Sequence, residues 1–350
     1  MFGITNAFSK VASASPLKAS RVLRTGRPQR LILMGTGPFA VPSFDALRQA
    51  GHEIALVVTR PAIVVKSRKG APTSPVREFA AANGYDIFDP ESINTPDAIA
   101  MLAAKRASLL IVCDYGQILS SDALATTPLG GINLHGSLLP AYRGAAPVQW
   151  AVLNGDAIAG VSVIHMTPRL DGGPILATAE IPVDPADTSG SLESKLSLLG
   201  VEPTLSSVEL LALWDLKSSI GTQQDKSKVS RAPRLNKASG HIDWTHSASE
   251  IDCHVRGMQP WPGSFADIHI GDDKPPIRIS VRKVSVLDSQ ASPESPPGTL
   301  IGDRFLDVCT GPIESPGILR IDRLQPAGRN EISGDEFIRG YRLKSGIRFG

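Results

Sequence analysis

The sequence predicts two domains, a doubly wound α/β domain with a mostly parallel sheet followed by a small β-barrel. Its 350 residues suffice for both, since a domain typically takes about 100–200 residues. From residue 31 to about 216, short apolar runs alternate with helical stretches, which is typical of parallel strands covered by helices on both faces. Beyond residue 240, short β-like stretches separated by Gly and Pro indicate a small barrel or sandwich.

The elements are placed by the apolar runs and by the residues that end them. In the first domain, strands are expected at 31–34, 54–58, 109–112, 132–134 and 161–166, and helices at 42–50, 75–83, 96–106 and 191–214. Residues 217–240 are polar and basic, so we expect a linker there. In the second domain, a helix is expected at 248–256 and strands at 277–286, 298–301, 305–309 and 318–324. The expected division is therefore an extension at 1–30, a domain at 31–216, a linker at 217–240 and a domain at 241–350.

The composition excludes several classes of protein. With 42% hydrophobic and 20% charged residues, the chain is neither mainly disordered nor a coiled coil. No apolar run approaches the roughly 18 residues of a membrane-spanning helix, so no membrane partner is expected. Three distant cysteines, Cys113, Cys253 and Cys309, indicate neither a disulfide framework nor a zinc site, and reducing conditions fit them best. We expect no bound metal.

Charge is distributed unevenly along the chain. Residues 1–30 carry six basic and no acidic side chains, residues 31–216 have a net charge of −7, and residues 217–350 have a net charge of +3. The basic, Ser-rich extension fits a bacterial protein with a disordered extension or an early assigned start codon, and a cytoplasmic location. The alternative is a transit peptide into a mitochondrial or plastid matrix. The basic C-terminal part is compatible with a nucleic-acid partner.

The turn after the first strand, Gly35-Thr36-Gly37, could indicate a dinucleotide site. The fingerprint of such sites has a third glycine where this chain has Ala40, although alanine is tolerated there in some variants. It also has an acidic residue after the second strand, where Thr59-Arg60 stands instead. A nicotinamide site is therefore disfavoured.

Polar side chains cluster after two later strands. Asn133 and His135 alternate with Leu134 on one strand, so they are expected on the same face of the sheet. Asp171 follows the next strand, in a loop with Gly172 and Gly173. An amide, an imidazole and a carboxylate at one sheet edge suit acyl transfer, because they can stabilise an oxyanion and move a proton. The alternatives are a strand-end histidine satisfied by backbone and an aspartate that only shapes a turn.

These residues belong to a longer pattern. The run Asn133-Leu134-His135-Gly136-Ser137-Leu138-Leu139-Pro140, with Arg143-Gly144 and Leu170-Asp171-Gly172-Gly173, resembles enzymes that transfer the formyl group of 10-formyltetrahydrofolate. Ile242-Asp243-Trp244, Gln259-Pro260-Trp261-Pro262 and Leu324-Gln325-Pro326-Ala327-Gly328 narrow the resemblance to the members that formylate methionyl-tRNA, over about residues 31–345. The resemblance implies a Rossmann-like formyltransferase domain and an OB-like C-terminal domain that contacts tRNA.

The resemblance also implies roles for individual residues. Asn133 and His135 would polarise the formyl carbonyl, with Asp171 assisting His135. The folate co-substrate would be bound by Ser137, Leu138, Leu139, Pro140, Asp114, Tyr115 and Gly116. The tRNA would be bound by Arg60, Lys66, Arg68, Lys69, Lys226, Lys228, Arg231, Arg234 and Lys237. Pro38 and Pro174 stand where family members commonly have an acidic residue, which affects the expected loop shape but not the chemistry.

The expected function is transfer of the formyl group to the amino group of methionine on initiator tRNA, by a monomer. One alternative is a sugar-nucleotide formyltransferase that uses the same folate donor. Another is an RNA-binding protein without transferase activity, which should lack Asn133, His135 or Asp171, and all three are present.

Overall fold

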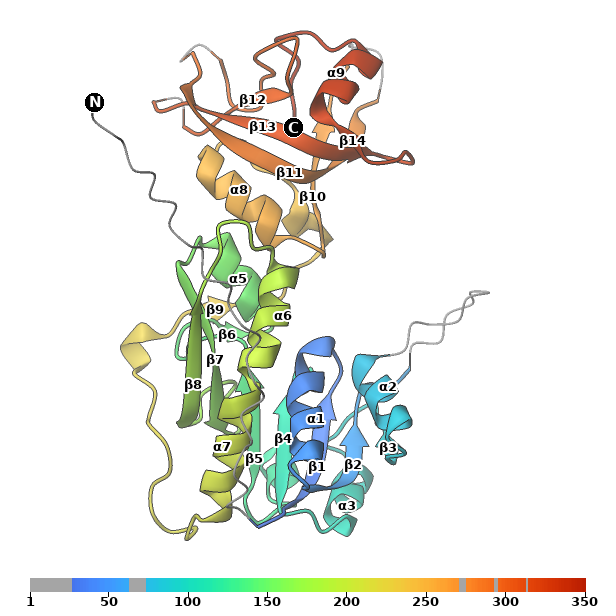
Figure 1. The fold of residues 1–350 in the computed structure, drawn as a ribbon, viewed down its shortest axis with the longest axis vertical. Helices are drawn as coiled ribbons and strands as arrows, with labels where there is room; N and C mark the ends of the chain where they lie inside the picture. The colour runs from blue at the N-terminus through green and yellow to red at the C-terminus, as the bar shows by residue number, and fades with distance from the viewer. Residues whose placement is uncertain (1–26, 63–73, 271–274, 293–294, 313) are drawn as a thin grey trace, which may run out of the picture.

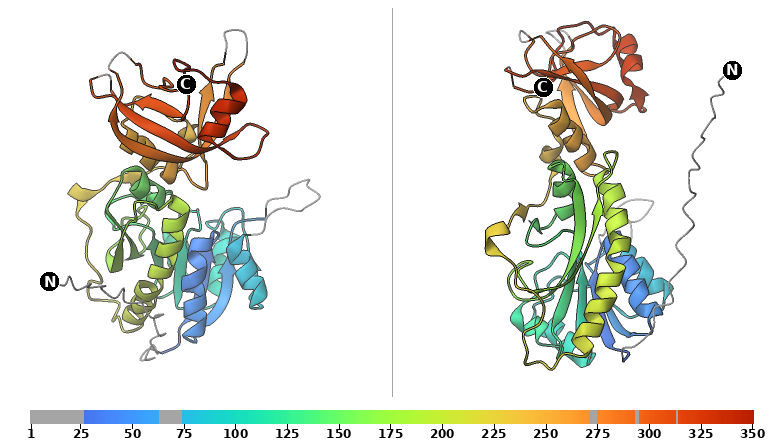
Figure 2. Two further views of the ribbon diagram at one scale, coloured as in Figure 1. Left: turned by 45° about the horizontal axis from the view of Figure 1, so that its top comes forward. Right: turned by 60° about the vertical axis from the view of Figure 1, so that its left-hand side comes forward.

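The computed structural model describes residues 27–62, 74–270, 275–292, 295–312 and 314–350. Two domains are stacked end to end, with helix α8 (Ala248–Gly257) at their junction (Figure 1), and two further views show the same arrangement (Figure 2). The first domain contains a mostly parallel sheet and the second an antiparallel sheet, which confirms the predicted fold class.

The first domain is built on a sheet with the strand order β3-β2-β1-β4-β5-β7-β8. These strands are β1 (Arg30–Gly35), β2 (Glu53–Val58), β3 (Ile87–Phe88), β4 (Leu109–Cys113), β5 (Gly131–His135), β7 (Ile158–His165) and β8 (Ile175–Pro182). The pairings from β3 to β5 are parallel, whereas β7 and β8 run antiparallel to their neighbours. The continuous apolar runs predicted the central strands because strands buried on both faces need such runs.

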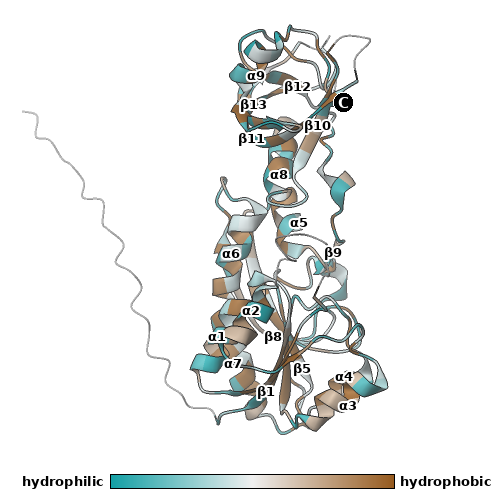
Figure 3. Cartoon of the chain, turned by 90° about the vertical axis from the view of Figure 1, so that its right-hand side faces the viewer, coloured by the Kyte–Doolittle hydropathy of each residue, from teal (hydrophilic) through white to brown (hydrophobic). Residues whose placement is uncertain are grey.

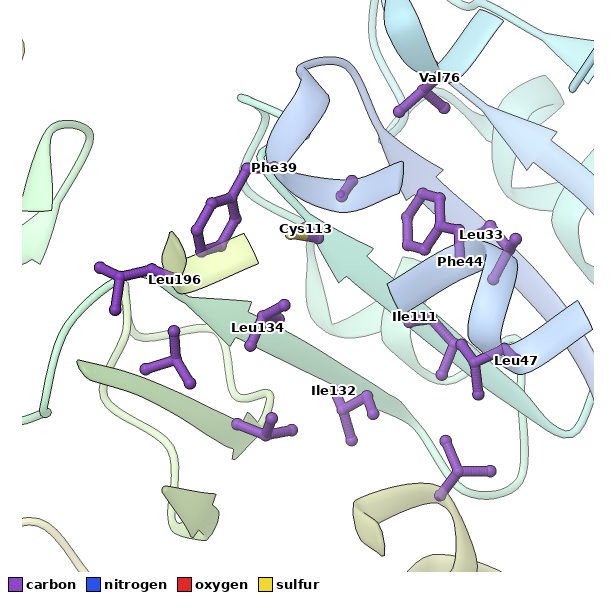
Figure 4. Close-up of a cluster of buried hydrophobic side chains, with 14 of the residues drawn as sticks. Leu33, Phe39, Phe44, Leu47, Val76, Ile111, Cys113, Ile132, Leu134 and Leu196 are labelled. Carbon is purple, nitrogen blue, oxygen red and sulfur yellow. The ribbon is translucent and has the colours of Figure 1, made fainter. Parts of the chain in front are cut away.

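Helices cover both faces of this sheet. They are η1 (Pro38–Ala40), α1 (Val41–Gln49), α2 (Pro75–Ala82), α3 (Pro96–Ala104), α4 (Ser121–Leu124), α5 (Pro147–Leu153), α6 (Ser189–Leu199) and α7 (Val201–Ala212). Leu31 and Leu33 of β1 enter the core shared with α1, α6 and α7, part of which is drawn in Figure 4. Ile32 and Met34 enter the core shared with α3 and α4 on the other face. Figure 3 shows the two groups of helices on opposite sides of the strands.

The second domain has the sheet order β10-β11-β13-β12, with β14 paired to β13. Its elements after α8 are β10 (Ser264–Ile268), β11 (Ile277–Gln290), β12 (Asp307–Thr310), β13 (Gly317–Pro326), β14 (Ile332–Ser333) and α9 (Gly334–Tyr341). Bridges from Leu300 to Val308, Thr299 to Arg348, and Ile268 to Phe349 connect β12 back to β10. This path joins the two ends of the sheet, as in a small barrel.

The structure differs from the expected elements at several places. The helix expected at 191–214 is divided at Gly200 into α6 and α7, because Pro203 has no N–H with which to continue the helical hydrogen bonds. The strand expected at 298–301 forms only isolated bridges. The edge strand β8 was missed because its residues are only half-buried, and β10 and α9 were also missed. The Ser333–Glu336 capping box is the signal that predicts α9.

The linker is not a free tether. It runs along the side of the first domain (yellow in Figure 1) and contains η2 (Lys226–Lys228), β9 (Arg231–Ala232) and η3 (Lys237–Gly240). Strand β9 pairs with β6 (Arg143–Gly144), which lies directly after the β5 loop. The linker therefore crosses over the segment that follows Asn133 and His135.

The domains meet where α8 packs on α5. A Cβ atom added to Gly257 would lie 2.7 Å from the Leu153 side chain, so any other residue there would force Leu153 or the helices to move. The Ser189 hydroxyl donates to the Gly257 carbonyl at 2.7 Å, and Arg256 donates to the Asp187 carbonyl at 3.0 Å. These contacts fix the second domain against the α6 end of the first.

Candidate active site

A cavity lies where the strand order reverses. The chain runs from β1 outward to β2 and β3, then returns to β4 and β5 on the other side of β1. In open α/β sheets, a crevice forms at the carboxyl ends of the strands at such a point. Here it has a volume of about 480 Å³ and is lined by Phe39 after β1, Asp114 after β4, Asn133 and His135 on β5, and Asp171 after β7.

Strand β5 places the side chains of Asn133 and His135 at this cavity. Its register places Asn133 opposite Ile164 and His135 opposite Ser162 of β7, so the two side chains share a face. Leu134 between them packs in the core on the other face (Figure 4). The alternation expected from the sequence is what the structure has.

The carboxylate of Asp171 is held beside the His135 ring. Its Oδ2 accepts a hydrogen bond from the Gly144 N–H at 2.9 Å, and its Oδ1 lies 3.8 Å from His135 Nδ1. His135 Nε2 lies 2.9 Å from the Tyr142 carbonyl oxygen, which can only accept, so Nε2 carries a proton in this arrangement. The backbone thus satisfies one ring nitrogen, as expected for a strand-end histidine that is held by backbone. The other ring nitrogen faces Asp171.

The backbone around the cavity is unusual at three residues. Asp114, Tyr142 and Asp171 have φ angles of 48°, 61° and 47°, in the left-handed region that residues other than glycine seldom adopt. Such conformations persist only where the surrounding structure enforces them, and they concentrate at functional sites. Each of the three follows a strand or a loop that contributes to the cavity.

One wall of the cavity combines acidic and basic groups. Asp114 is exposed to the open cavity. The protein packed around its carboxyl group nevertheless displaces part of its water, which raises its pKa against the opposing effects of Arg60, the Gly37 N–H and Arg234. Glu193 on α6 also lines the cavity, and burial together with the Asp114 charge raises its pKa. The wall suits a polar ligand, because its carboxyl groups can accept or donate hydrogen bonds.

Comparison with known proteins decides the family. The formyl transferase family matches residues 29–206, and the formyl transferase C-terminal domain family matches residues 234–342. The methionyl-tRNA formyltransferase of Rhodopirellula baltica is 52% identical over 324 residues, which cover 91% of this chain and 95% of that protein. The chain belongs to the methionyl-tRNA formyltransferase family.

Two solved structures show that the fold is shared more widely than the sequence. HypX from Aquifex aeolicus, solved with tetrahydrofolic acid, aligns with 90% of this chain at a TM-score of 0.56 and 14% identity, and this chain spans about half (48%) of its length. An N-formyltransferase from Helicobacter canadensis, solved with folinic acid and dTDP-3-aminofucose, aligns with 84% of this chain and 99% of its own at a TM-score of 0.56 and 16% identity. These likenesses concern the fold alone.

The residues expected to bind folate divide into two groups. Asp114, Tyr115 and Gly116 line the cavity. The side chain of Tyr115 points into the core, so only its backbone is offered to a ligand. The segment Ser137, Leu138, Leu139 and Pro140 is not among the described residues that line the cavity. The Ser137 hydroxyl donates to the Ala141 carbonyl and Leu139 N–H to the Ser162 hydroxyl, so the segment is tied into the fold.

The residues expected to bind tRNA also differ in their surroundings. Arg60 lies against the cavity wall, where its Nε donates to the Tyr115 carbonyl at 3.1 Å. Arg234 lines the cavity as well, so the linker reaches the active site. Four others are exposed on the linker: Lys226, Lys228, Arg231 and Lys237. Lys66, Arg68 and Lys69 lie outside the described residues, as do residues 1–26 of the basic extension.

The sequence alone did not single out Glu193, nor Gln224 of the linker. Glu193 lies on a helix face with no neighbouring motif, and Gln224 lies among the polar residues of a segment without apolar pattern. Among the described residues, no group of three or more His, Cys, Asp and Glu side chains could hold a metal ion. Nor does any described helix have the length and apolarity needed to cross a membrane.

Proposed function

We propose that this protein transfers the formyl group of 10-formyltetrahydrofolate to the α-amino group of methionine on initiator tRNA, at the cavity formed by β4, β5 and the β7–β8 loop. The observation that carries the proposal is the convergence of Asn133, His135 and Asp171 on one cavity in a chain of this family. The products are formylmethionyl-tRNA and tetrahydrofolate. We further propose that the enzyme acts as a monomer in the bacterial cytoplasm.

The chemical step is an acyl transfer without a covalent enzyme intermediate. The amine attacks the formyl carbon, a carbon–nitrogen bond forms, and the carbonyl oxygen becomes an oxyanion. The Asn133 amide stabilises that charge as a hydrogen-bond donor, and His135 stabilises it once its ring is protonated, because in the neutral ring Nε2–H is held by the Tyr142 carbonyl and Nδ1 has no proton. His135 Nδ1 takes the proton that the amine loses, and the Asp171 carboxylate 3.8 Å away stabilises the resulting imidazolium. The bond to the folate nitrogen then breaks, and that nitrogen receives the proton.

Folate would occupy the wall after β4. The backbone of Asp114, Tyr115 and Gly116 is open to the cavity there, and backbone groups can pair with the edge of a planar heterocycle. Gly116 lies under the Arg60 guanidinium, and its φ of 79° is a conformation that residues with a side chain rarely adopt. Arg234, which lines the cavity near Asp114, and the exposed linker cations would face the acceptor, because such cations neutralise phosphates.

A formyl-transfer assay with parallel acceptors tests the proposal. The purified protein is given 10-formyltetrahydrofolate and one of three acceptors: methionine-charged initiator tRNA, charged elongator tRNA, or a 4-amino sugar nucleotide. Transfer to initiator tRNA alone is expected. Transfer to the sugar nucleotide alone would establish the sugar-nucleotide alternative and overturn the proposed acceptor. Transfer to none of them would leave an RNA-binding protein without this activity.

An active-site variant shows whether the proposed residues perform the transfer. Asn133→Ala is expected to lower turnover about a hundredfold while the fold is retained, since one preorganised oxyanion donor typically contributes about 2.7–4 kcal/mol. Circular dichroism and thermal unfolding check the fold of the variant. A folded Asn133→Ala protein with normal turnover would contradict the assignment.

A further inference from the structure

The linker reaches the catalytic loop through one side chain, Gln224. Its Nε2 donates to two carbonyl oxygens, those of Asp171 at 2.8 Å and Gly173 at 2.7 Å. Its Oε1 accepts from Arg143, from Nε at 3.1 Å and from Nη2 at 2.5 Å. The donors and the acceptor of this amide are therefore all engaged, and they join three segments that are far apart in the sequence.

Those three segments are the ones that place Asp171. The loop after β7 carries Asp171 itself, and Arg143 precedes Gly144, whose N–H donates to the Asp171 carboxylate. The linker is also held by its backbone beside this loop. Thr222, two residues before Gln224, exchanges two backbone hydrogen bonds of 2.8 Å with Ile175, the first residue of β8 after the loop. Gln224 thus closes a ring that runs from the Asp171 carboxylate through Gly144 and Arg143 back to the Asp171 carbonyl.

Asp171 needs such support because its backbone is strained. Its φ of 47° lies in the left-handed region, which is unfavourable for a residue other than glycine and persists only where the surrounding structure enforces it. The hydrogen bond to the Asp171 carbonyl fixes the peptide plane that directly follows the strained residue, and the one to the Gly173 carbonyl holds the loop two residues further on. Without them the loop can relax, and the carboxylate moves relative to His135.

We propose that Gln224 is a positioning residue for formyl transfer, which acts through Asp171 rather than by touching either substrate. This inference rests on the proposed function, because it assigns Asp171 a part in the chemical step. Gln224 lies in the linker that was expected to bind tRNA, so a contribution to tRNA binding is the competing role. The two roles differ in their kinetic signature: positioning affects kcat, whereas tRNA binding affects KM for tRNA.

The test compares Gln224→Ala, Gln224→Glu and the matched control Gln223→Ala, an exposed neighbour. Gln224→Glu keeps the size and the acceptor for Arg143 but points an oxygen at the two carbonyls. Both Gln224 variants are expected to lose kcat roughly tenfold to a hundredfold, as for small misplacements of a reacting group, with KM for tRNA within about twofold. Gln223→Ala should match the wild type, and thermal unfolding should show all three folded.

A double variant checks that the effect passes through Asp171. In an Asp171→Asn background, Gln224→Ala is expected to lower kcat by less than about twofold more, because residues that act through one group are not additive. A full further loss there, a normal kcat in Gln224→Ala, or an effect confined to KM for tRNA would each overturn the inference.

Amide hydrogen exchange around residues 171–175 gives a readout that does not depend on activity. The exchange rate should rise in Gln224→Ala and not in Gln223→Ala. If wild-type protein fails to formylate methionyl-tRNA, the proposed function fails, while the exchange result still reports on the loop.

Discussion

Replacing Asp171 by Asn isolates the contribution of one charge. The amide keeps the shape of the carboxylate and an oxygen that can accept from the Gly144 N–H. What it removes is the negative charge 3.8 Å from His135 Nδ1, in a pair whose side chains are only 6% and 10% exposed. Two opposite unit charges at that distance attract by about 4 kcal/mol in a medium with an effective dielectric constant of about 20.

This attraction exists only while the His135 ring is protonated, which occurs as the amine gives up its proton. About 4 kcal/mol corresponds to a loss of roughly a thousandfold in turnover. The assay is single-turnover formyl transfer to methionine-charged initiator tRNA, with separate measurement of folate binding, which should be unchanged. The control is Glu180→Gln, an exposed carboxylate on β8. Turnover of Asp171→Asn within about tenfold of the wild type would refute the electrostatic reasoning.

Two further predictions concern stability and are measured by denaturant unfolding. Tyr115→Phe should raise the free energy of unfolding by about 1 kcal/mol, because the buried hydroxyl has no partner among the described residues. Burial raises the pKa of Tyr115 from 10.0 to about 12. Between those two pH values the tyrosine ionises only in the unfolded state, so the free energy of unfolding of the wild type falls as pH rises. The difference in free energy of unfolding between Tyr115→Phe and the wild type therefore widens. Phe44→Ala should cost about 3–5 kcal/mol, since Phe44 is fully buried, whereas Met101→Ala, at 42% exposure, should change stability little. A constant gap across pH, or equal costs for Phe44 and Met101, would contradict these predictions.

The order of the sheet explains in part why the candidate site could be predicted from the sequence. Asn133 and His135 lie at the carboxyl end of β5, which is parallel to β4, and such ends form the crevice of an open sheet. Asp171 was expected at the same edge, but β7 runs antiparallel to β5 and ends beside Ile132, so only the return of the loop after β7 brings Asp171 to His135. The strand pattern in the sequence does not reveal this return. The direction of the Ser137–Pro140 segment could not be predicted in this way, because it depends on Ser162 of β7, a partner 25 residues away from Ser137.

The split of the helix after residue 199 shows a different kind of limit. The signal, Gly200 followed by Pro203, is present in the sequence, but periodic apolar residues continue across it. The glycine at the break leaves room for the Leu134 side chain, which would lie 2.7 Å from a Cβ atom at Gly200. The residue between Asn133 and His135 thus enters the gap between two helices, a contact that no local pattern reveals.

We propose that the linker joins acceptor recognition to the chemical step. Between its contacts at Gln224 and at Arg231–Ala232, the chain turns outward through η2, which presents Lys226 and Lys228 to solvent. Because both ends of this turn are fixed to the loops around His135 and Asp171, a phosphate bound there has a defined distance to the reacting atoms. A small sugar acceptor gains nothing from cations held outside the cavity, whereas an RNA extends far enough to reach them. The fold is shared with an N-formyltransferase solved with dTDP-3-aminofucose and does not by itself distinguish these acceptors, so we expect the attachment of this linker to contribute to the distinction.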